Sequence, residues 1–99
     1  MPLTEDVIKK IAEDTGVGID ELTPFALLAL LKEKKRKIMI ERMELLGRHN
    51  VKTSDELEGK IKTGEIPEHP AWEDLIVIEN LEAAIARLND DMETIQQSA

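Results

Sequence analysis

The residues that could bind a metal ion or transfer a proton are two histidines and the carboxylates near them. His69 follows Glu65 and Glu68 in the stretch EIPEH, whereas His49 has no acidic neighbour in sequence. A di-iron helical bundle uses Glu-x-x-His on a helix, but the residue three places before His69 is Ile66. The zinc-protease pattern His-Glu-x-x-His is also absent. We therefore expect both histidines to be exposed polar residues of loops, with no metal site.

Nucleophilic and phosphate-binding chemistry have equally little support in the sequence. The chain contains no cysteine, which excludes disulfides, thiolate catalysis and thiolate metal sites. Neither the P-loop pattern nor the dinucleotide pattern GxGxxG occurs. Thr4, Thr23 and Thr53 each precede a stretch with helical periodicity, so helix capping explains them. The sequence thus predicts no catalytic residue and no cofactor.

The clearest charged feature is a basic stretch in the middle of an acidic chain. Residues 24–52 contain eight Lys or Arg against three Glu, whereas residues 1–23 contain two against six acids, and residues 53–99 three against twelve. One interpretation is internal pairing with the acidic flanks. The other is a surface for a polyanion such as nucleic acid, with contacts from Lys32, Lys34, Lys35, Arg36 and Lys37.

Three observations count against the polyanion interpretation. On a helix these cations would surround the axis rather than form one stripe, and no aromatic residue is interleaved for base stacking. The net charge of −8 also opposes a polyanion. A nucleic-acid-binding helical protein remains the second hypothesis. A more remote one is a small all-helical dimeric enzyme with Lys35, Arg36, Arg42 and Lys60 in a pocket between helices.

The strongest pattern is a heptad repeat in the last third of the chain. Apolar residues return there in alternating steps of three and four, the spacing that keeps one seam facing a partner helix. They are Ile78, Leu81, Ile85, Leu88, Met92 and Ile95. This pattern predicts a long helix over residues 70–96.

A second long helix is predicted over residues 24–46. Thr23 and Pro24 form a start signal, with Thr at the N-cap and Pro at the first helical position. Residues Leu31, Ile38 and Leu45 are seven apart and share the heptad spacing of the last helix. Gly47 is expected to end the helix. Shorter helices are predicted over residues 4–15 and 54–62.

These elements predict a single all-α domain over residues 1–99. We expect the two long helices to form an antiparallel, coiled-coil-like hairpin, accompanied by the two short helices. Residues 25–31 and 75–78 are apolar on every face, more than one hairpin can cover, so we expect two copies to dimerise into a four-helix core. The expected interface comprises Phe25, Leu28, Leu31, Ile38, Leu45, Trp72, Leu75, Ile78, Leu81, Ile85, Leu88 and Met92.

Trp72, one of only two aromatic residues, has two interpretations. It either plugs the core at the loop end of the hairpin or anchors a partner, because Trp is enriched at interaction hot spots. We expect Trp72 to plug the core.

The function predicted from the sequence is that of a protein–protein interaction module. It would be a self-associating scaffold, accessory subunit or regulator without catalytic activity, partnered by a second copy or another helical protein. No apolar run is long enough to span a membrane, and the N-terminus lacks a signal-peptide pattern. With the absence of cysteine, this leads us to expect a cytoplasmic protein.

Overall fold

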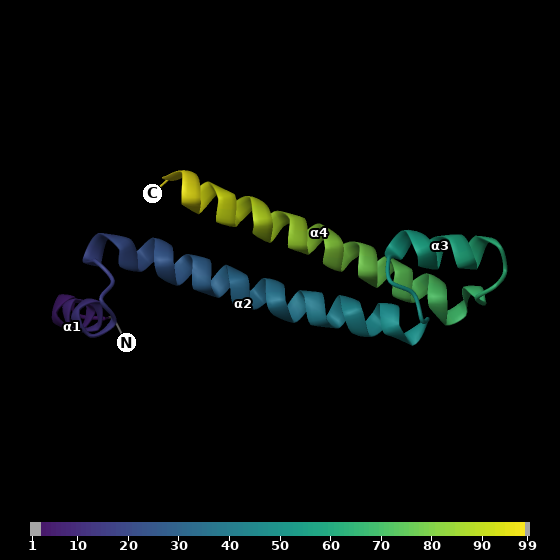
Figure 1. Ribbon diagram of the computed structural model, residues 1–99, viewed down its shortest axis with the longest axis horizontal. Helices are drawn as coiled ribbons and strands as arrows, with labels where there is room; N and C mark the ends of the chain where they lie inside the picture. Colours follow the sequence, from purple (N-terminus) through teal and green to yellow (C-terminus); the bar gives the residue numbers. More distant parts are fainter. Residues whose placement is uncertain (1–2, 99) are drawn as a thin grey trace.

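The computed structural model describes residues 3–98, and within this range it is all-helical, as the sequence predicts. Figure 1 shows the long helices α2 and α4 side by side, with α3 covering one end of the pair. The four helices are α1 (Glu5–Thr15), α2 (Ile19–Arg48), α3 (Ser54–Lys62) and α4 (Glu68–Ser98). No helix within this range is long and apolar enough to cross a membrane.

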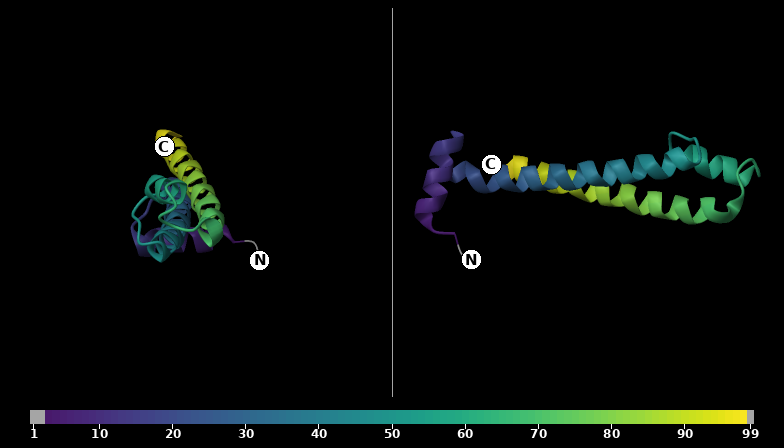
Figure 2. Two further views of the ribbon diagram at one scale, coloured as in Figure 1. Left: turned by 90° about the vertical axis from the view of Figure 1, so that its right-hand side faces the viewer. Right: turned by 90° about the horizontal axis from the view of Figure 1, so that it is seen from below.

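The molecule is elongated, because the two long helices determine its shape. Its extents are 62 × 26 × 21 Å and its radius of gyration is 19.7 Å, whereas a compact domain of this length has a radius of about 13 Å. Figure 2 shows α1 lying across the beginning of α2, at the end of the molecule opposite α3. Most of the length of α2 therefore has only α4 beside it.

The start of α2 differs from the prediction. The helix begins at Ile19 after Gly18, and Pro24 lies inside it rather than at its first position. Residues 19–23, which precede the predicted start of the helix, therefore contribute a helical turn. The acidic residues Asp20 and Glu21 lie in that first turn, where they interact favourably with the helix dipole.

The end of α2 also lies beyond the predicted stop at Gly47. The helix continues to Arg48, and His49 occupies the C-cap position. The left-handed conformation that reverses the chain belongs to Asn50, with φ of 53°. Asn is the side chain that most readily replaces Gly in this conformation.

The capping signals of the short helices are confirmed. The Thr4 side chain accepts a hydrogen bond from the Val7 amide, and Thr53 accepts one from the amide of Glu56 at 3.1 Å. The Glu56 carboxylate in turn accepts from the Lys52 amide at 3.0 Å, one residue earlier than a standard capping box. Regular helix in α4 begins after His69, whose backbone is non-helical.

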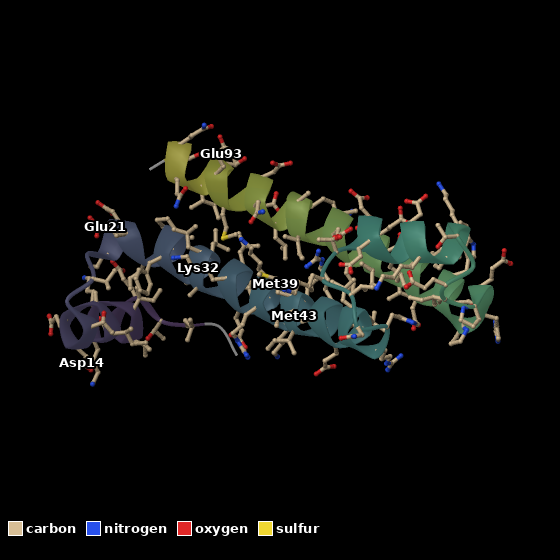
Figure 3. The ribbon with its side chains drawn as sticks, turned by 45° about the vertical axis from the view of Figure 1, so that its right-hand side comes forward. Asp14, Glu21, Lys32, Met39, Met43 and Glu93 are labelled. Atoms are coloured by element: carbon tan, nitrogen blue, oxygen red, sulfur yellow. The ribbon has the colours of Figure 1, made fainter. Side chains whose placement is uncertain are left out.

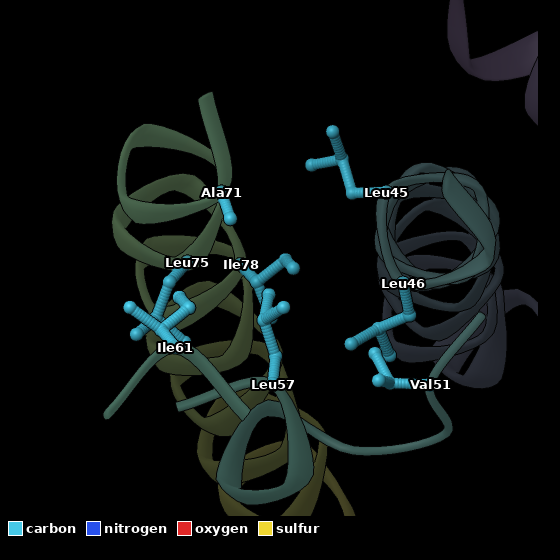
Figure 4. Packing of buried hydrophobic residues seen from close by; sticks show 8 residues of the cluster. All are labelled: Leu45, Leu46, Val51, Leu57, Ile61, Ala71, Leu75 and Ile78. Carbon is cyan, nitrogen blue, oxygen red and sulfur yellow. The ribbon is translucent and has the colours of Figure 1, made fainter. Parts of the chain in front are cut away.

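The main hydrophobic core lies where α3 meets the long helices (Figure 4). Leu57 of α3 and Ile78 of α4 are fully buried there. The cluster consists of Leu45, Leu46, Val51, Leu57, Ile61, Ala71, Leu75 and Ile78, with Ile66 and Leu81 packed against it. Residues from three helices and a loop are thus needed to exclude water, which the α2–α4 pair alone does not achieve.

This location of the core predicts unequal effects of the same substitution at two isoleucines of α4. Ile78→Ala should lower the free energy of unfolding by about 2–5 kcal/mol, because it leaves a cavity in the core. Ile76→Ala is the matched control, since Ile76 is 48% exposed, and should change the stability by less than about 1 kcal/mol. Urea denaturation followed by circular dichroism measures both values, and equal losses would contradict this core.

Candidate interaction surface

The heptad residues of the two long helices line the contact between α2 and α4. Burial is greatest near α3, where Leu45, Leu75 and Ile78 are buried. It decreases along the pair, because the remaining seam residues have no third helix above them. Residues that are half-buried are Leu28, Leu31 and Ile38 of α2 and Leu81, Ile85, Leu88, Met92 and Ile95 of α4.

Two charged residues occupy seam positions that sequence reasoning did not identify. Lys35 and Arg42 are half-buried and continue the three-four spacing between Leu31, Ile38 and Leu45. The signal was present in the sequence, because these two positions complete the heptad pattern of α2. Apolar residues mark only every second position of this part of the seam, so a search for apolar periodicity does not detect the charged residues between them.

A polar network connects α2, α3 and α4 across this seam. Arg42 Nε donates to Glu82 Oε2 at 2.8 Å, and Ser54 Oγ donates to Glu82 Oε1 at 2.9 Å. The Glu82 carboxylate therefore accepts hydrogen bonds from one residue of α2 and one of α3 at the same time. Because Arg42 and Glu82 are both half-buried, the pair is shielded from water more than a surface ion pair.

His49 was expected to be an exposed loop residue, and this prediction is wrong. Its side chain is 11% exposed, and Nε2 lies 2.8 Å from Oδ2 of Asp74, a seam residue of α4. Asp74 also lies 3.9 Å from the Arg48 guanidinium. The helix extension through Arg48 brings His49 over α4, which explains why it is not exposed. His69 is exposed, with Nδ1 2.8 Å from the Glu73 carboxylate.

Trp72 does not plug the core, so the prediction of a buried Trp72 is wrong. It is 47% exposed on the outer side of α4, beside Ile61, Lys62 and Glu68. The small side chain of Ala71, one residue earlier, fills the buried position instead. Phe25, the other aromatic residue, is 60% exposed.

The basic stretch of α2 does not form one continuous cationic face. Lys32, Lys34, Arg36 and Lys37 are exposed at different angles around the helix, and Lys35 turns into the seam. Arg36 donates two hydrogen bonds to Glu33, at 2.8 and 2.9 Å. These bonds lower the pKa of the Glu33 carboxyl below its ordinary value, so this carboxylate stays charged to a more acidic pH than an isolated Glu. Within residues 3–98 no group of three or more potential metal ligands comes together.

Large apolar side chains remain exposed along the whole molecule. Figure 3 shows Met39 and Met43 following Lys32 along α2. The exposed set is Leu3, Val7, Ile11, Ile19, Phe25, Leu27, Leu30, Met39, Ile40, Met43, Trp72, Ile76 and Val77. Large exposed apolar patches on soluble proteins mark protein–protein interaction sites or ligand-binding grooves.

The fold and this surface define an all-helical protein in which two long helices pack together and much apolar surface is uncovered. The whole chain, residues 1–99, matches the Uncharacterized protein MJ0235 family, and the chain belongs to that family. Comparisons with curated proteins and with solved structures give no match. Its function must therefore be inferred from the geometry described above.

The polar network predicts that two glutamates of α4 differ in importance. Glu82→Ala removes the partner of half-buried Arg42 and of Ser54 and should lower the free energy of unfolding by about 1–3 kcal/mol. Glu79→Ala is the control, because Glu79 is exposed, and should change it by less than about 0.5 kcal/mol. Thermal unfolding of both variants at one ionic strength makes the comparison. A Glu82→Ala variant as stable as the wild type would show that the network does not join the three helices.

Proposed function

We propose that the protein is an interaction module that acts as a homodimer. Two copies would pair their α2–α4 antiparallel hairpins into a four-helix core, without catalytic activity of their own. In that form the protein would serve as a scaffold, accessory subunit or regulator for other proteins.

The observation that carries this proposal is the excess of exposed surface. The chain exposes 7425 Å², whereas a compact monomer of 11.2 kDa exposes about 5,700 Å². The surplus of roughly 1,700 Å² is about twice the 800 Å² that each partner contributes to a standard-size interface. Pairing with a second chain is the simplest way to cover that surface, because all four helices of residues 3–98 are already placed.

The antiparallel hairpin is supported by the order of the side-chain pairs. Arg42 pairs with Glu82, and the later residue His49 pairs with the earlier residue Asp74. Residue numbers that rise along one helix while they fall along the other are typical of antiparallel neighbours.

Self-association is tested by the solution mass. Light scattering over a tenfold concentration range should give a species near 22 kDa, twice the chain mass of 11.2 kDa. A mass of 11.2 kDa throughout, at micromolar concentrations, would contradict the dimer. In that case the exposed apolar surface would be expected to bind a different protein.

The nucleic-acid alternative makes a separate prediction. Because the cations surround α2 and Arg36 already binds Glu33, we expect no binding of a labelled oligonucleotide at about 150 mM salt, where exposed charges are screened beyond roughly 8 Å. Fluorescence anisotropy measures binding, with the Lys34→Glu, Lys37→Glu double variant as the control. Tight wild-type binding that this variant abolishes would favour the alternative.

A further inference from the structure

A second row of residues with heptad spacing runs along α2, beside the seam that faces α4. Its steps are four, three, four, three and four, and all six residues are exposed. We call it the α2 row: Phe25, Ala29, Lys32, Arg36, Met39 and Met43. Steps of this kind keep side chains on one face over five turns, as contact with another helix requires.

The protein itself covers the end of this row. The next position in the same spacing is Leu46, which is 3% exposed because it packs in the core cluster with Leu57 and Ile61 of α3. One turn earlier Met43 is 65% exposed. The face that α3 covers within the chain therefore continues, uncovered, along α2.

A groove lies beside the uncovered part of the row. It encloses about 430 Å³ between α2 and α4 and is lined by Met39, Met43 and Ile85, with the Arg42–Glu82 pair at its side. Methionine side chains adapt their shape to a partner and make favourable contacts with aromatic rings. The groove is thus suited to a large apolar side chain.

We propose that the α2 row of a second copy, running antiparallel, occupies this face. This inference rests on the proposed self-association and specifies its interface. The row is self-complementary about position 34: Phe25 lies opposite the partner's Met43, Ala29 opposite the partner's Met39, and Lys32 opposite the partner's Arg36. A two-fold dimer requires such reciprocity, because each contact must occur twice.

The size of the side chains agrees with this register. Phe25 of each copy enters the groove beside Met43 of the other, and small Ala29 leaves room for Met39. In this register the contact of the row ends at Met43, because the next position, Leu46, is already buried in the core cluster. The two α3 helices then lie at opposite ends of the dimer.

The centre of the interface is basic, which limits its affinity. Arg36 is matched by Glu33 of its own chain, but the two Lys32 side chains have no acidic partner within 4.0 Å among the described residues. This basic centre predicts the direction in which a charge reversal should change the affinity of the dimer. Lys32→Glu should lower the dimer dissociation constant by about tenfold, because it places a carboxylate opposite the partner's Arg36 in two symmetric contacts.

A substitution at the apolar ends of the row should weaken the dimer instead. Phe25→Asp should raise the dissociation constant at least about tenfold, since it removes an anchor from both halves of the interface. Leu30→Asp is the matched control, because Leu30 is 54% exposed on the same helix but lies off the row. It should leave the dissociation constant unchanged in analytical ultracentrifugation.

The register itself is tested by cross-linking, which is simple because the chain has no cysteine. The double variant Ala29→Cys, Met39→Cys should form a covalent dimer under mild oxidation. Within one chain these positions are about 15 Å apart along the helix and cannot join. Each single variant alone should stay uncross-linked, and a mixture of the two should give a heterodimer. The control is Leu30→Cys, Ile40→Cys, with the same separation and similar exposure but off the row.

The outcomes separate this inference from the proposed function. A light-scattering dimer with cross-linking at 29 and 39 but not at 30 and 40 supports the row. A dimer that does not cross-link at 29 and 39, or that Lys32→Glu weakens, overturns the row and leaves self-association intact. A monomeric wild-type protein overturns both.

Discussion

The packing of α3 onto the two long helices is the contact on which the rest of the structure depends. Leu57 and Ile61 of α3 meet Leu75 and Ile78 of α4, and Leu46 of α2 completes the cluster. Two helices alone have one shared seam and leave the remaining sides of each in water, so a third element is needed to exclude water on both sides. That element is nine residues long, and its reach determines where the core ends.

Beyond α3 the α2–α4 contact changes in character. Its seam residues are half-buried, and Lys35 and Arg42 occupy positions that an apolar residue would fill in a closed bundle. Long basic side chains at such positions lie with their aliphatic stems against apolar neighbours and keep their charges near water. Glu82 then sets the pairing of α2 with α4, because an ionised pair with good geometry tolerates little displacement.

This division of the molecule is the physical basis of the interaction function that we propose. One end carries the hydrophobic core and holds the helices together, while the part of α2 beyond that core presents exposed apolar and basic residues. In the proposed function, stability and interaction are thus located in different parts of the chain. A dimer of the proposed kind would place the closed end of each copy beside the open end of the other.

The sequence determined the features that depend on local spacing. The heptad steps predicted both long helices, and the caps at Thr4 and Thr53 were found from residue type and position alone. The start of α2 was missed because the acidic turn at Asp20 and Glu21 outweighed the signal from Pro24. Heptad spacing and helix capping both act over one or two helical turns, so they can be recognised in a single sequence.

Tertiary structure decided which positions are covered. Trp72 and His49 were both misplaced from the sequence, because their burial depends on α3 and on the extension of α2 through Arg48 rather than on their neighbours in the chain. Arg42 finds its partner forty residues later in the sequence, in Glu82. The same holds for the α2 row, whose spacing is present in the sequence but whose exposure follows from how far α3 extends. Periodicity assigns a residue to a face of its helix, and packing with distant elements decides whether that face meets protein or water.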